Sequence, residues 1–125
     1  MSSAVQLSGI TAVMLGVRDL AQSVAFYKDK LGLKVIMQEP GLALLQAGAV
    51  MLGLNPGMGR GVPQLAGATE VVFQVDNVRA AHQALTAKGI TFVSEPHAVT
   101  PTSWAAHFRD VDGHLLSVFG PEGTI

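Results

Sequence analysis

Apolar residues occupy alternate positions of residues 11–17, where Val13, Leu15 and Val17 fall on one side of an extended backbone. A period of two is typical of a β-strand with one buried face. Met14 belongs to the other side of the same strand. We therefore expect the valine and leucine side to pack beneath a helix and the Met14 side to line a cavity.

A helix is predicted directly after this strand. Asp19 stands at the position of an N-cap, and Gln22 follows three residues later, as in a capping box. Apolar residues then recur at helical spacing until Gly32, which is expected to end the helix. An extended apolar run, residues 33–37, predicts a second strand.

The same order of elements occurs twice in the chain. The stretch TAVMLGVRDL, which begins at Thr11, aligns with TEVVFQVDNV, which begins at Thr69. Asn77 then becomes the N-cap of a second helix, which Gly89 is expected to end. Besides the strand at residues 33–37, further strands are predicted at residues 42–46 and 49–54 in the first half and at residues 103–109 and 114–119 in the second.

These patterns predict an α+β protein of two tandem βαβββ repeats. Repeat one is expected at residues 9–55 and repeat two at residues 68–121, with a Gly- and Pro-rich linker at residues 56–67. A chain of 125 residues with 49% hydrophobic residues can bury one core, so residues 1–125 are expected to form one domain.

Composition narrows the classes of function. A net charge of -1 and 14% charged residues give no basic surface for nucleic acid. We find no apolar run long enough to span a bilayer and no signal-peptide pattern in MSSAVQLSG, so a cytoplasmic protein without a membrane partner is expected. The chain has no cysteine, which excludes disulfides and thiolate chemistry.

Two longer stretches, VRDLAQSVAFYKDKLGLKV and FRDVDGHLLSVFG, resemble the signature segments of the vicinal oxygen chelate superfamily. This family includes glyoxalase I, bleomycin-resistance proteins, extradiol dioxygenases and fosfomycin-resistance enzymes. The resemblance covers residues 9–121 and implies that each repeat curls into a partly open barrel around a cavity. It also implies a homodimer. The fold does not define the chemistry, because function depends on the site.

Metal-dependent members of this superfamily carry a ligand on the first and last strand of each repeat. The resemblance places these four positions on Ala12, Leu52, Glu70 and Ser117, with Gly53 replacing Leu52 if the register slips by one residue. Only Glu70 is a good ligand, since Ala and Leu offer no donor atom. We therefore expect no metal at the family position and no other cofactor.

The four histidines are scattered over the second half of the chain. His82 lies in the predicted second helix, His97 in a loop and His114 after the DVDG segment, so only His107 is expected to reach the cavity. The segment DVDGH, residues 110–114, begins like a calcium-binding loop but lacks the later oxygen ligands. It is predicted to be a hairpin turn.

The cavity wall is predicted to be apolar with few polar groups. Glu70 is expected to be paired, with Arg18, Arg60 or Arg109 as candidates, or protonated; a water-exposed edge position is the alternative. Trp104 could stack on a planar ligand at the rim or pack in the core. Each apolar member of the wall could equally be ordinary core. The predicted ligand-binding residues are Met14, Leu52, Leu54, Glu70, Val72, Gln74, Trp104, His107, Leu115, Ser117 and Phe119.

Three functions agree with these residues. The first is a metal-independent binding protein of the glyoxalase and bleomycin-resistance type, which binds or sequesters an apolar or aromatic small molecule. The second is a metal-free isomerase, epimerase or lyase with Glu70 as the catalytic general base. The third is an interaction module with a filled cavity. Binding is favoured because the sequence pairs no second catalytic group with Glu70, and the ligand itself stays unnamed.

Overall fold

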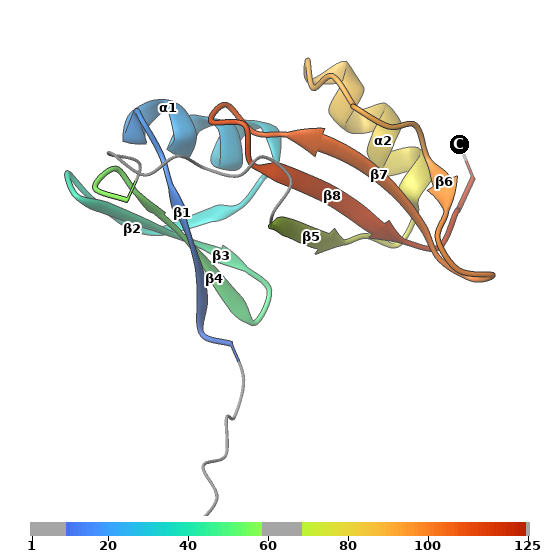
Figure 1. Ribbon diagram of the computed structural model, residues 1–125, viewed down its shortest axis with the longest axis horizontal. Helices are drawn as coiled ribbons and strands as arrows, with labels where there is room; N and C mark the ends of the chain where they lie inside the picture. Colours follow the sequence, from blue (N-terminus) through green and yellow to red (C-terminus); the bar gives the residue numbers. More distant parts are fainter. Residues whose placement is uncertain (1–9, 59–68, 125) are drawn as a thin grey trace, which may run out of the picture.

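Two four-stranded mixed sheets, one from each repeat, form the protein (Figure 1). The computed structural model describes residues 10–58 and 69–124. The first repeat consists of β1 (Ala12–Gly16), α1 (Leu20–Ala25), η1 (Phe26–Lys30), β2 (Lys34–Glu39), β3 (Leu42–Ala47) and β4 (Val50–Asn55). The second repeat consists of β5 (Glu70–Gln74), α2 (Val78–Ala87), β6 (His97–Ala98), β7 (Trp104–Arg109) and β8 (Leu115–Gly120).

The two sheets have the same topology, with strand orders β1-β4-β3-β2 and β5-β8-β7-β6. The first and last strands of each repeat pair in parallel, and the other neighbours pair antiparallel. The predicted α+β fold of two βαβββ repeats is confirmed, and the sheets stay partly open. The single-domain organisation remains a prediction, and most of the predicted linker lies outside the described residues.

The helices begin where the sequence predicts. Asp19 and Asn77 each accept a hydrogen bond from the backbone N–H three residues on, at 3.0 and 2.9 Å. Gly32 and Gly89 follow the helices with φ of 75° and 93°, a left-handed conformation that glycine adopts without strain. One difference is that the first helix continues as a π-helix, η1, after Ala25.

The second strand of the second repeat, β6, is shorter than its counterpart in the first, β2. β6 has only two residues, and an isolated bridge between Phe92 and Phe108 replaces the earlier part of the strand. Pro96 lies between these two pairings and has no N–H, so it can contribute no donor to the ladder there.

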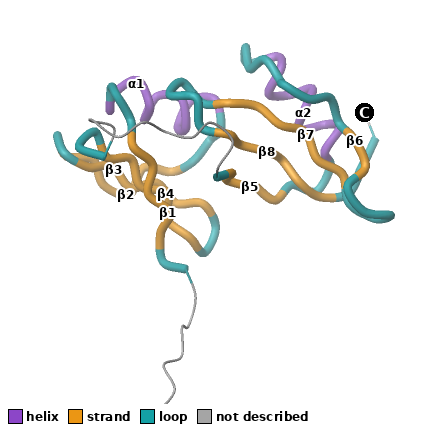
Figure 2. Tube along the Cα trace, viewed as in Figure 1, coloured by secondary structure: helices purple, strands orange, loops and turns teal. Residues whose placement is uncertain are grey.

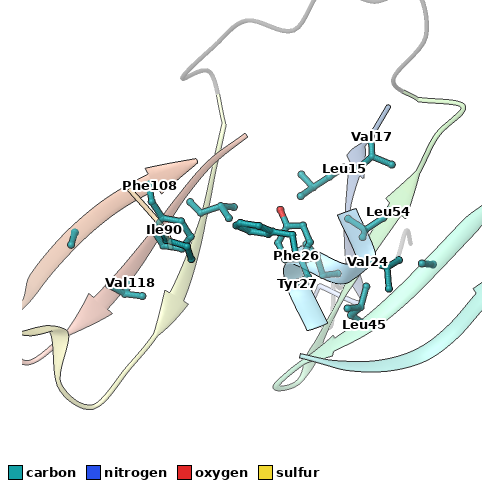
Figure 3. Close-up of a cluster of buried hydrophobic side chains, with 14 of the residues drawn as sticks. Leu15, Val17, Val24, Phe26, Tyr27, Leu45, Leu54, Ile90, Phe108 and Val118 are labelled. Carbon is teal, nitrogen blue, oxygen red and sulfur yellow. The ribbon is translucent and has the colours of Figure 1, made fainter. Parts of the chain in front are cut away.

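The helices cover one face of each sheet (Figure 2), and the core lies between them. Figure 3 shows Tyr27, Leu45 and Leu54 in the first repeat and Phe108 in the second, all fully buried. The predicted helix-facing side of β1, which includes Leu15, is part of this core. In the described parts of the chain, no helix is long and apolar enough to cross a membrane.

The hairpin turn between β7 and β8, residues 110–114, joins the two repeats (Figure 1). Asp112 accepts a hydrogen bond from the backbone N–H of Arg18 at 2.9 Å and another from the hydroxyl of Ser23 at 2.8 Å. The Arg18 guanidinium also contacts this carboxylate, at 3.1 Å. Burial alone would raise the pKa of Asp112, but these donors outweigh it and hold the pKa below its ordinary value.

Two further contacts strengthen this junction. The hydroxyl of Tyr27 donates to Asp110 at 2.5 Å, and His114 Nε2 lies 2.7 Å from the carbonyl oxygen of Gly16. Burial first, and then the charge of Asp110, raise the pKa of Tyr27 far above its ordinary value. The two stretches that resemble family signatures therefore bind each other, and they determine how the repeats meet.

Candidate functional site

The face of the second sheet that points away from α2 carries most of the predicted site residues. The strand register places alternate residues of β5, β7 and β8 on this face. They surround a cavity of about 280 Å³, which we call the Glu70 cavity. Its lining consists of Glu70, Val72, Val99, Ala105, His107, Ser117 and Phe119.

A carboxylate and an imidazole meet within this apolar wall. Glu70 Oε2 lies 3.0 Å from His107 Nε2, and the two side chains are 32% and 26% exposed. The contact crosses β8 diagonally, because His107 pairs with Ser117 and Glu70 pairs with Leu115. Glu70 is thus paired and partly solvated on an edge strand, rather than buried without a partner.

Two more side chains surround the His107 imidazole. The hydroxyl of Ser94 lies 2.9 Å from Nδ1 and accepts the backbone N–H of His107 at 3.0 Å. The ring of His97 stacks on the His107 ring, with centroids 5.4 Å apart and planes inclined by 17°. The imidazole is therefore held at both nitrogens and on one face.

His107 was predicted to reach the cavity but not to pair with Glu70. Of the three arginines predicted as partners, Arg18 contacts Asp112, Arg109 donates to the carbonyl of Gly113, and Arg60 lies outside the described residues. The pairing register of β5, β7 and β8 is the signal that would have placed His107 beside Glu70. That register depends on tertiary structure, so the pattern within one strand does not contain it.

A larger cavity of about 540 Å³, the edge cavity, lies between β5 and the turn from β3 to β4. Glu70 and Val72 line both cavities, whereas His107 lines only the Glu70 cavity. We place the candidate site in the smaller cavity, because polar groups converge there. Gln74 lines the edge cavity, and Leu115 shares the open face without lining either cavity.

The prediction that Leu52 and Leu54 share a face with Met14 is wrong. Leu52 pairs with Val13 and Leu54 pairs with Leu15, so both belong to the core side of the sheet. They are 2% and 0% exposed, although Leu52 also borders the edge cavity. A register error of one residue exchanges the two faces of a strand.

Gly53 occupies the position beside Met14, as the alternative register predicted. The Met14 thioether lies directly over Gly53, where even a methyl group would collide with its sulfur. Met14 is on the open face of the first sheet and is 37% exposed, but it lines neither cavity.

Trp104 lies on the helix side of the second sheet, away from the Glu70 cavity. It pairs with Gly120 and packs against the core, and the Arg79 guanidinium lies 4.9 Å from its ring centroid. The predicted stacking on a ligand at the rim is therefore wrong, and the packing alternative holds.

A profile of the family described as "Glyoxalase/Bleomycin resistance protein/Dioxygenase superfamily" matches residues 9–118. The chain belongs to this superfamily. The resemblance noted from the two signature stretches is thereby confirmed.

Among relatives of known sequence, the uncharacterized protein YraH of Bacillus subtilis (strain 168) is 30% identical over 122 residues, covering 86% of this chain and 94% of YraH. A glyoxalase/bleomycin resistance protein/dioxygenase structure from Nocardioides is 26% identical, with a TM-score of 0.76 and coverage of 98% of this chain and 92% of that one.

Two further structures share the fold. Lactoylglutathione lyase from Agrobacterium tumefaciens is 22% identical, with a TM-score of 0.75 and coverage of 90% of this chain and 93% of that one. TnmS3, an antibiotic binding protein from Streptomyces sp. CB03234, is 21% identical, with a TM-score of 0.76 and coverage of 94% and 99%.

The residues of this superfamily member do not fit a family-type metal ion. Glu70 and Ser117 stand at two of the four ligand positions, and Ala12 and Gly53 stand at the others. Alanine and glycine side chains supply no donor, so a divalent cation would lack half its protein ligands. Within residues 10–58 and 69–124, no group of three or more His, Asp or Glu residues could hold a metal.

Proposed function

We propose that this protein binds a planar apolar or aromatic small molecule in the Glu70 cavity without the help of a metal. The observation that carries the proposal is a concave, mostly apolar wall with one paired carboxylate at its edge. Apolar walls with a few oriented polar groups are typical of small-molecule sites. The fold similarity to TnmS3, an antibiotic binding protein, supports a binding role.

The wall and the carboxylate have separate roles in this proposal. Burial of a few hundred Å² of apolar ligand surface at about 25 cal/mol per Å² supplies several kcal/mol. After the cost of lost ligand freedom, micromolar binding is reasonable. Glu70 selects among ligands, because its carboxylate accepts an N–H or O–H and repels an anion.

A series of single-ring probes tests this function. Benzamide and phenol are expected to bind with micromolar to millimolar dissociation constants in titration calorimetry, and benzoate is expected to bind at least tenfold more weakly. Glu70→Gln should narrow that gap, because it removes the charge but keeps the side-chain size. Equal binding of benzamide and benzoate, unchanged in Glu70→Gln, would contradict the proposed site.

His82→Gln is the matched control for these titrations. His82 Nε2 makes a similar contact with Glu95, at 3.1 Å, but lines neither cavity. This variant should bind every probe as the wild type does. Trp104 emission is a poor reporter of binding, because the ring lies on the far side of the sheet.

The second candidate function is a metal-free isomerase, epimerase or lyase. The observation that favours it is the Glu70–His107 contact. This contact gives Glu70 a titratable neighbour, which the sequence alone did not pair with it. Glu70 would accept a proton from the substrate and His107 would hold or return one. Turnover of a bound compound that Glu70→Gln abolishes would favour this function over binding alone.

We also propose that the chain forms a homodimer. β1 and β5 are edge strands of their sheets, and the open faces expose large apolar side chains. Val72 and Val99, which line the Glu70 cavity, are each 53% exposed. Light scattering at micromolar concentration should give twice the 13.0 kDa chain mass, and a monomeric mass would remove this part of the proposal.

A further inference from the structure

Ser94 lies behind the candidate site, next to the imidazole nitrogen that points away from Glu70. Its hydroxyl is 2.9 Å from His107 Nδ1, while Nε2 of the same ring is 3.0 Å from Glu70. Ser94 does not line the Glu70 cavity, whereas both other side chains do. Ser94 therefore acts on a ligand only through His107.

The Glu70 carboxylate and the Ser94 hydroxyl together determine where the imidazole proton resides. One lone pair of the Ser94 oxygen accepts the backbone N–H of His107, at 3.0 Å. If neutral His107 carried its proton on Nδ1, a bare Nε2 lone pair would face the Glu70 carboxylate at 3.0 Å, and two acceptors repel each other. With the proton on Nε2, the Ser94 hydroxyl donates to Nδ1, and the N–H group of Nε2 lies beside the Glu70 carboxylate, which attracts it.

We propose that Ser94 is a positioning residue that keeps His107 in the Nε2–H tautomer, so that Glu70 Oε2 is occupied and Oε1 accepts an N–H or O–H from the ligand. The proposal rests on the proposed binding function. Among the described residues, His107 is the one side chain that forms an ion pair with the Glu70 carboxylate, and it does so at Oε2. A ligand with a proton to donate, such as an amide or a phenol, matches the remaining oxygen.

The backbone around Ser94 allows a clean test. The backbone N–H groups of Val93 and Ser94 both donate to the carbonyl oxygen of His107, at 2.8 and 3.3 Å. Ser94→Ala removes the hydroxyl but leaves these bonds, so the segment should stay beside β7. Ser94→Thr keeps a hydroxyl at the same position and is the rescue variant.

The first measurement needs no ligand. Long-range ¹H–¹⁵N spectra of the imidazole, assigned with His107→Gln, should show the Nε2–H tautomer of His107 near pH 7.5 in the wild type and in Ser94→Thr. Ser94→Ala should show a larger share of the Nδ1–H tautomer, because Nδ1 loses its hydroxyl donor while Glu70 alone still favours a proton on Nε2. A purely structural serine would leave this signature unchanged. An Nδ1–H tautomer in the wild type, or an unchanged tautomer in Ser94→Ala, would overturn the proposal.

The second measurement is titration with benzamide. Ser94→Ala should bind it at least fivefold more weakly than the wild type, and Ser94→Thr and His82→Gln should bind it equally well. Equal affinity in Ser94→Ala would overturn the link between the tautomer and ligand binding. A further outcome is that the tautomer changes in Ser94→Ala while the wild type binds none of the probes. That result would support the positioning role of Ser94 and reject the proposed function.

Discussion

Single positions in this protein are constrained by how closely backbone segments approach each other. A Cβ atom at Gly120 would lie 2.0 Å from the carbonyl oxygen of Val75, which belongs to the backbone and cannot move aside. Gly41 has open space around the same position and an ordinary φ. Glycine at 120 is therefore required by packing, and glycine at 41 is not.

This contrast gives a paired prediction. Gly120→Ala should lower the free energy of unfolding by about 1–3 kcal/mol, because overpacking forces the end of β8 away from Val75. Gly41→Ala should change it by less than about 1 kcal/mol. Urea unfolding of the two variants beside the wild type measures both values. Equal stability of the two variants would show that β8 does not approach Val75 this closely.

The sequence predicts the face of the sheet on which a side chain lies when the alternation within a single strand is enough to decide it. The alternation along β5 put Glu70 and Val72 on the open face, and the structure has them there. The alternation along β4 separates its two faces equally well. Which of them continues the open face of β1 depends on the pairing register, and the sequence of neither strand gives that register. Leu52 was assigned to the wrong face for that reason.

At the scale of secondary-structure elements, the β7–β8 turn joins the repeats through hydrogen bonds to Arg18, Ser23 and Tyr27. Tyr27→Phe should lower the free energy of unfolding by about 1–3 kcal/mol, because Asp110 is 7% exposed and loses a buried donor. Thermal or urea unfolding measures this loss. A Phe variant as stable as the wild type would mean that the Tyr27 hydroxyl contributes no net stabilisation.

Asp112 in the same turn predicts how stability depends on pH. Its pKa is lowered in the folded protein from an ordinary value of 3.8, so the unfolded chain binds a proton at a higher pH than the folded one. The stabilisation is fully present above about 3.8 and is lost as the pH falls toward the lower folded pKa.

The corresponding measurement is urea unfolding between pH 2.5 and 6. Asp112→Asn should be less stable than the wild type at pH 6, and the difference should shrink as the pH falls below about 3.8. Asp76→Asn, a change at an exposed carboxylate, should follow the wild-type profile. A constant difference between Asp112→Asn and the wild type would contradict this assignment.

The sequence predicted the elements well where local signals specify them, and less well where packing does. Asp19 and Asn77 cap the helices as expected, since an N-cap depends only on its own first turn. The π-helical continuation after Ala25 and the two-residue β6 have no comparable local signal. The general order of strands and helices came from the internal repeat.

For the molecule as a whole, the missing metal-ligand side chains predict that divalent transition metals do not change its thermal stability. A tenfold excess of Zn²⁺ or Ni²⁺ should leave the melting temperature unchanged, because a cation bound only to the folded state would raise it. Ala12 and Gly53 are the reason. A rise in melting temperature that Glu70→Ala abolishes would restore a metal at the family position.

The contact between the β7–β8 turn and α1 makes the two repeats unequal partners. Asp76, Ala81 and Leu85 stand in the second repeat where the first has Arg18, Ser23 and Tyr27, so they offer the acidic turn none of its donors. A chain assembled from two copies of either repeat would lack one half of this junction. Each half therefore depends on the other for this junction, and a chimera that exchanges a single half with a distant family member would separate the donors from the turn that they bind.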